Sequence, residues 1–121
     1  EGEISYAGPS SVERARLAGD ILQKRLQEKF TDMRIDYIGI QSAHRKEFAD
    51  QVTPYEIRLR VAAKAMTSSE AEIIGEEVEA LYTNGPAGGG GVRKYVNEVI
   101  GIVSVLADRN KFVPKVNIFQ S

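Results

Sequence analysis

The chain has 121 residues and a mass of 13.3 kDa, which suits one domain with a single core and is too short for two. A hydrophobic content of 42% and a charged content of 27% exclude a disordered chain and a membrane-spanning protein. The 16 basic and 17 acidic residues give a net charge of -1, so we expect no nucleic-acid partner, and the absence of cysteine excludes disulfides and thiolate metal sites.

The first residues have none of the basic, apolar and small-residue regions of a signal peptide, and we expect a cytoplasmic protein. The chain starts at Glu1 without an initiator methionine. We therefore expect it to begin inside a longer gene product.

The chain opens with a short β-prone segment, Ile4–Tyr6, which Gly8 and Pro9 close. Ser10 and Glu13 then have the Ser-x-x-Glu spacing of a capping box, which predicts the start of a helix that runs to about Phe30. Its apolar residues recur at steps of three and four and form one stripe: Ala18, Ile21, Leu22 and Leu26.

Two strands are predicted next, over residues 33–40 and 55–65, on either side of a long polar loop over residues 41–54. The second strand alternates, with one apolar face made of Tyr55, Ile57, Leu59, Val61 and Ala63. The charged residues that alternate with this face are Glu56, Arg58 and Arg60. We expect them to pair with Asp36 across adjacent strands. His44, the single histidine, lies in the loop and is interpreted as a surface residue.

A second capping box, Thr67 with Glu70, predicts another helix with an apolar stripe of Ala71, Ile74, Val78 and Leu81, ended by Asn84 and Gly85. After the glycines, Val96–Leu106 is apolar on both faces and predicts a central strand covered on both sides. Lys115–Phe119 predicts a last strand.

These elements predict an α+β fold of the ferredoxin-like type, with two helices on one face of a mainly antiparallel sheet that has one extra strand. If the second face of the sheet is as apolar as Val96–Leu106 indicates, a second copy or a neighbouring domain has to cover it. We therefore expect a homo-oligomer or a partner domain.

One stretch, residues 84–94, is not explained by secondary structure. Glycine amides can form a concave nest for an anion, and two cations follow them. The candidate ligand-binding residues are Asn84, Gly85, Gly88, Gly89, Gly90, Gly91, Arg93 and Lys94. The alternative is a flexible or tightly turned connector, because the stretch matches neither a P-loop nor a dinucleotide fingerprint. The residues indicate no catalytic side chains, no metal site and no particular cofactor.

The segments Ile4–Pro9, Glu13–Ala18 and, above all, Leu81–Arg93 resemble the C-terminal domain of the acyclic terpene utilisation protein A (AtuA-like) family. The resemblance implies a small ferredoxin-like domain that accompanies a larger N-terminal α/β domain or subunit. It also implies a role in the breakdown of acyclic terpenes such as citronellol and geraniol through coenzyme A thioesters, with an acyl-CoA or carboxylate ligand for the glycine segment.

Two hypotheses follow for the chain, which we do not expect to be an enzyme by itself. In the first, it is part of an acyl-CoA-processing enzyme, and its glycine segment holds a phosphate or a carboxylate. In the second, it is a non-catalytic oligomerisation or assembly module that packs against a partner.

Overall fold

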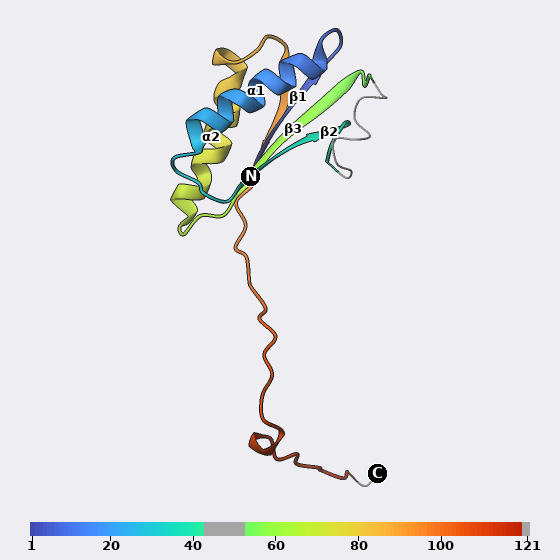
Figure 1. Cartoon of the computed structure of the whole chain (residues 1–121), viewed down its shortest axis with the longest axis vertical. Helices are drawn as coiled ribbons and strands as arrows, with labels where there is room; N and C mark the ends of the chain where they lie inside the picture. The colour runs from blue at the N-terminus through green and yellow to red at the C-terminus, as the bar shows by residue number, and fades with distance from the viewer. Residues whose placement is uncertain (43–52, 120–121) are drawn as a thin grey trace.

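The computed structural model describes residues 1–42 and 53–119 (Figure 1). The loop predicted over residues 41–54, with His44, therefore lies largely outside the described residues. The elements are β1 (Gly2–Ala7), α1 (Ser11–Leu26), β2 (Met33–Ile38), β3 (Glu56–Ala63), α2 (Ser68–Asn84), β4 (Gly89–Lys94) and a short 3-10 turn, η2 (Arg109–Lys111).

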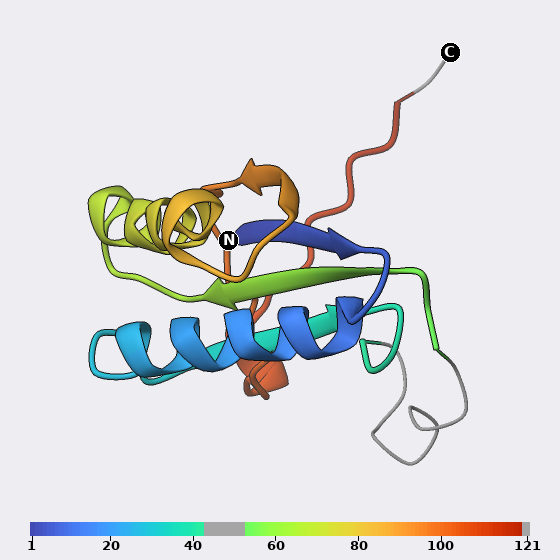
Figure 2. The same ribbon diagram turned by 90° about the horizontal axis from the view of Figure 1, so that it is seen from above.

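The four strands form one sheet in the order β2-β3-β1-β4, and every neighbouring pair is antiparallel. Figure 2 shows the strands following one another in this order. Both helices lie on the same side of the sheet (Figure 1). This arrangement confirms the predicted ferredoxin-like α+β fold.

The core lies between the helices and the inward-facing residues of the two central strands. Ile4 and Tyr6 of β1 and alternate residues of β3 are fully buried. The predicted stripes supply the helical side of the core, although Ile21 is only partly buried. The buried residues are Ile4, Tyr6, Ala15, Ala18, Leu22, Leu26, Phe30, Ile57, Leu59, Val61, Ile74, Val78 and Leu81. All of them precede residue 82, so the buried core is complete before β4.

One of the two predicted helix caps is wrong. Ser10 adopts a left-handed conformation with φ 55°, and its side chain makes no capping hydrogen bond. Ser11, the first residue of α1, instead ties the start of the helix to neighbouring segments, because its hydroxyl donates to Pro54 O at 3.1 Å and its amide to Gly8 O at 3.2 Å. The second cap is confirmed, because Thr67 Oγ1 accepts from the Glu70 amide at 3.2 Å.

The position of the last strand also differs from the prediction. The glycines themselves form it, as Gly89–Lys94, and they occupy the free edge of β1. Val96–Leu106 is therefore not a central strand of this sheet, and Lys115–Phe119 is not a strand either. The expected extra strand is not found in the described part of the chain. These segments run away from the body of the domain in an extended form (Figure 1).

Candidate functional site

The residues predicted to bind an anion follow one another along the end of α2 and the edge of the sheet. Asn84 ends α2, and the Gly85 amide donates to Leu81 O at 3.1 Å. Gly88 is in the left-handed region, with φ 76°, in the turn before β4. Gly89, Gly90, Gly91, Arg93 and Lys94 all lie in β4. Residues 85–88 thus form a turned connector between α2 and the sheet, and the rest of the segment is an edge strand.

Two of the glycines have structural reasons for their identity. A Cβ atom at Gly89 would lie 2.8 Å from Ile4 Cδ1, closer than atoms can pack. Gly91 has φ 62°, where the register between β4 and β1 shifts between Glu3 and Ser5. A bulge of this kind places a glycine in the left-handed region. Close packing and chain geometry therefore explain these two positions.

Several polar groups of the segment's backbone already have partners inside the domain. Arg14 Nη1 donates to Ala87 O at 2.8 Å. The Val92 amide donates to the hydroxyl of Tyr82 at 3.1 Å. Gly91 O accepts from Arg58 Nη2 at 3.1 Å. These contacts hold the segment in place and leave fewer main-chain groups for a ligand.

The two cations of the segment lie on opposite faces of the sheet, because consecutive strand residues alternate. Lys94 packs its stem against Gly75 of α2, and its ammonium donates to Glu79 at 2.6 Å. This hydrogen bond raises the pKa of Lys94. Arg93 is exposed and lies opposite Glu3 on the face without helices. Nothing would contact a side chain at Gly90, so the surface near Arg93 is open there.

Arg14 has an organising role that the sequence did not indicate. Its guanidinium donates to the carbonyl oxygens of Ala7, Pro9 and Ala87. It also lies 5.9 Å from the centre of the Tyr6 ring. The side chain therefore ties the turn after β1 to the turn before β4. Only the fold brings these turns together, so no local pattern around Arg14 could have revealed the contact.

The face of the sheet without helices is charged. Arg58 is fully engaged there, since Nε donates to Glu3 at 2.6 Å, Nη1 to Ser5 Oγ at 3.0 Å and Nη2 to Gly91 O. The expectation of an apolar second face was wrong, because it rested on placing Val96–Leu106 in this sheet.

Asp36 is the centre of a second group of charges on the same face and is only 6% exposed. Its carboxylate accepts from Arg34 Nε at 2.8 Å and from Arg60 Nη1 at 3.0 Å. Arg60 also donates to the Glu1 carboxylate, and this hydrogen bond is the main reason why its pKa is raised. The predicted pairing of Asp36 across strands is confirmed.

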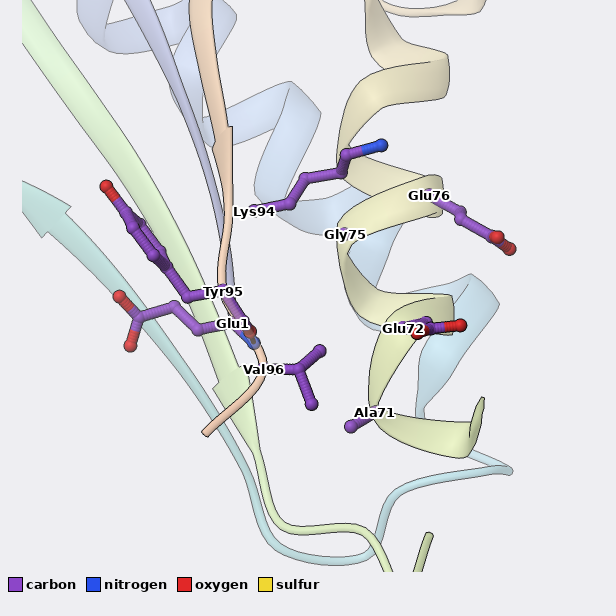
Figure 3. Close-up of a pocket in the computed structure, with 8 residues that line it drawn as sticks. All are labelled: Glu1, Ala71, Glu72, Gly75, Glu76, Lys94, Tyr95 and Val96. Atoms are coloured by element: carbon purple, nitrogen blue, oxygen red, sulfur yellow. Dashed lines mark hydrogen bonds between the residues drawn. The ribbon is translucent and has the colours of Figure 1, made fainter. Parts of the chain in front are cut away.

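A groove of about 270 Å³ lies between α2 and the point where the chain leaves β4 (Figure 3). Val96 and Ala71 point toward each other across it. Glu72 and Glu76 extend from α2 away from Val96. Beyond Lys94 the ladder continues for one pair, since Glu1 and Tyr95 each donate a main-chain N–H to the other's carbonyl at 2.8 Å. The groove thus lies where the C-terminal part of the chain leaves the sheet.

A second groove, of about 610 Å³, lies beside the start of α2. Phe30, Ile73 and the exposed Met66 give it apolar walls. At its rim the Nζ atom of Lys64 lies 3.7 Å from Oδ2 of Asp32, and both side chains are largely exposed. In the described residues no group of three His, Asp or Glu side chains is arranged to hold a metal ion.

The C-terminal tail, residues 97–119, is exposed at every position. Its large apolar side chains are Val99, Ile100, Ile102, Val103, Val105, Leu106, Phe112, Val113, Val116, Ile118 and Phe119, and each is at least 68% exposed. A soluble domain seldom exposes so many apolar side chains in one segment unless they bind something. The sequence analysis placed the start of this tail, Val96–Leu106, inside the sheet, whereas the structure leaves it exposed.

Comparison with known proteins identifies a family. The family model described as "Acyclic terpene utilisation family protein AtuA" matches residues 1–118. No curated protein and no solved structure matches the chain. Separately, neither helix of the described ranges, 1–42 and 53–119, has the length and apolarity needed to cross a membrane.

Proposed function

Because this chain belongs to the acyclic terpene utilisation family AtuA, which gives it a role in acyclic terpene utilisation, we propose that it acts there as a non-catalytic assembly domain. In this proposal the ferredoxin-like body is a rigid support, and the C-terminal tail joins it to another subunit. The chemistry, on coenzyme A thioesters of the terpene acids, belongs to a larger α/β domain or subunit of the same protein.

The observation that carries the proposal is the contrast between the body and the tail. The body has a packed core, and most charged groups on its uncovered face, Arg93 excepted, are bonded to one another around Arg58 and Asp36. The tail has apolar residues on both of its faces and touches none of that core. Burying apolar surface stabilises association by roughly 25 cal/mol per Å², so the tail has much to gain from a partner.

Removing the tail tests this role. A variant that ends at Val96 keeps every core residue, so its thermal unfolding, followed by circular dichroism, should match that of the whole chain. Native mass spectrometry would compare the two forms, each alone and co-expressed with a larger α/β polypeptide of the family. We expect the whole chain to enter an assembly and the shortened chain to stay monomeric. Identical assemblies from both forms would refute the role.

An anion-binding role for the glycine segment is the second candidate. It is supported by Arg93, an exposed cation on the uncovered face, and by the open surface at Gly90 in the same strand. A phosphate or carboxylate of an acyl thioester is the ligand class that an arginine binds with two hydrogen bonds.

Titration calorimetry with a coenzyme A thioester tests this candidate on three forms of the chain. Arg93→Ala should lose the binding, because it removes the cation on the uncovered face. Lys94→Ala is the matched control, since Lys94 lies on the other face and is bonded to Glu79. Equal affinity in the chain and in Arg93→Ala would remove this candidate.

A further inference from the structure

The groove beside the start of α2 has apolar walls and cations at its rim, and it is formed by Phe30, Lys64, Ala65, Met66 and Ile73 with their neighbours. We call it the Met66 groove. We infer that it binds a small amphipathic carboxylate, whose apolar chain lies in the groove and whose carboxylate contacts the ammonium of Lys64. This site is on the body of the domain, so the inference goes beyond the assembly role and does not depend on the tail.

The groove lies where two connections meet. Phe30 belongs to the connection from α1 to β2, whereas Lys64 and Met66 belong to the connection from β3 to α2. Figure 2 shows both connections at the same end of the sheet. Phe30 is part of the buried core, and Ala65 and Ile73 pack against that core. The walls are therefore held in place by the fold, as in a pre-formed ligand site.

The size and the walls of the groove suit an apolar chain. Its volume of about 610 Å³ is in the range of roughly 300 to 1,000 Å³ that small-molecule sites have. Met66, which lines it, is 93% exposed. A methionine side chain is flexible and adapts its shape to a ligand. Contact with an apolar chain would remove Met66 from water, and this burial favours binding.

The charges at the rim favour a ligand with a carboxylate. The ammonium of Lys64 has only a long, exposed contact with Asp32, at 3.7 Å, and such pairs contribute little. A ligand can therefore take the place of Asp32. Glu70, the other acid of the rim, is already engaged, because its Oε2 accepts from the Met66 amide at 3.0 Å. Lys29 adds a second exposed cation.

The first test titrates the whole isotopically labelled chain with octanoate and follows the amide signals by NMR. The method detects the roughly millimolar affinity that a ligand of this size reaches at an open site. We expect the signals of Phe30, Ala65, Met66 and Ile73 to shift. Shifts confined to the tail or to β4 would overturn the inference.

Two further probes separate the contributions of chain and charge. Acetate has the carboxylate without the chain, and octanamide has the chain without the charge. Each should bind to the Met66 groove at least about threefold more weakly than octanoate, because each lacks one of the two contacts. Equal affinity for octanoate and octanamide would overturn the assignment of a carboxylate ligand.

The second test changes the charges of the rim. Lys64→Gln should weaken octanoate binding about twofold to tenfold, since it removes the cation that the carboxylate contacts. Lys24→Gln is the matched control, because Lys24 is exposed on α1 and does not line the groove. Asp32→Asn should strengthen binding about twofold to fivefold, because nothing then competes for Lys64. Unchanged binding in Lys64→Gln, or weaker binding in Asp32→Asn, would contradict the role of Lys64.

The third test changes the apolar wall. Met66→Asp should weaken octanoate binding about tenfold or more, because it removes an apolar contact and adds a like charge. Met66→Leu keeps the contact and should bind as the unchanged chain does. Met66 is outside the core, so circular dichroism should show the same fold for both variants. Binding that survives in Met66→Asp would overturn the inference.

The groove and the assembly role fail separately. If octanoate shifts the signals of the Met66 groove but the chain never enters an assembly, the ligand site stands and the assembly role falls. If the tail is needed for assembly but octanoate leaves the groove unaffected, the assembly role stands and the ligand site falls.

Discussion

The hydroxyl of Tyr37 on β2 lies directly over Gly19 of α1, so the helix and the edge strand meet where the helix has no side chain. A Cβ atom at Gly19 would lie 2.9 Å from the Tyr37 ring carbon Cζ. Burial raises the pKa of Tyr37, and the nearby Asp20 raises it further. The glycine therefore sets how closely α1 approaches the sheet.

Gly19→Ala should lower the free energy of unfolding by about 1 to 3 kcal/mol, because overpacking outweighs the better helix propensity of alanine. Urea unfolding followed by circular dichroism measures the change. Gly101→Ala is the control, since nothing lies near Gly101, and it should leave the stability unchanged. In a double-mutant cycle with Tyr37→Ala the loss should shrink, and additive effects would show that the two residues are not coupled.

Arg14→Ala should lower the free energy of unfolding by about 1 to 3 kcal/mol, since four carbonyl oxygens, those of Ala7, Pro9, Ser10 and Ala87, lose a charged donor. Arg14→Lys should recover only part of this stability, because an ammonium cannot reproduce the planar fork of a guanidinium. Chemical denaturation of both variants provides the values. Arg16→Ala, in the same helix but exposed, should behave like the unchanged chain.

Tyr6→Phe should leave the chain as stable as before at neutral pH or stabilise it by up to about 3 kcal/mol, because the Tyr6 hydroxyl is buried and has no hydrogen-bond partner among the described residues. Burial also raises the pKa of Tyr6 above 10.0. The unfolded chain therefore ionises first, and stability is lost as the pH rises above about 10.

Thermal unfolding between neutral and strongly alkaline pH measures this effect. Tyr6→Phe should reduce the alkaline loss without abolishing it, because the pKa of Tyr37 is also raised. An identical alkaline loss in the variant would exclude Tyr6 as a cause.

Asp36→Asn should lower the free energy of unfolding by roughly 1 to 3 kcal/mol, because two arginines lose a nearly buried carboxylate. Asp32→Asn is the matched control, since its ion pair with Lys64 is long and exposed, and such pairs contribute about 0 to 1 kcal/mol. Guanidinium denaturation is unsuitable because the salt screens both pairs, so urea should be used. Equal losses in the two variants would show that burial of Asp36 is unimportant.

The fold was predictable because its signals are local. The stripe of α2 and the alternation of β3 each follow from the period of one element, and most of their residues are buried. Tyr55 is the exception, because it precedes β3 and is 78% exposed. The last strand was misplaced because Gly89–Gly91 has almost no intrinsic strand propensity, whereas Val96–Leu106 has much. The free edge of β1 and the close packing at Gly89 decided the outcome, and both are tertiary effects.

The site was less predictable than the fold. The sequence singled out residues 84–94 but placed Arg93 and Lys94 together, whereas the strand separates them onto two faces. The contacts of Arg14 join turns that are far apart in the chain, so no spacing rule could have found them. The apolar character of Val96–Leu106 was recognised, but its exposure was not, because composition does not tell which surface covers a segment.

The hydrogen bond from the Val92 amide to Tyr82 has a consequence for how copies of this domain meet. The free main-chain N–H and C=O groups of an edge strand can pair with a strand of another molecule, and such pairing leads to aggregation. Here a tyrosine hydroxyl holds one of the amides that an incoming strand would use, and the bulge at Gly91 bends the edge. The outer edge of β4 is therefore less able to accept an incoming strand at this point.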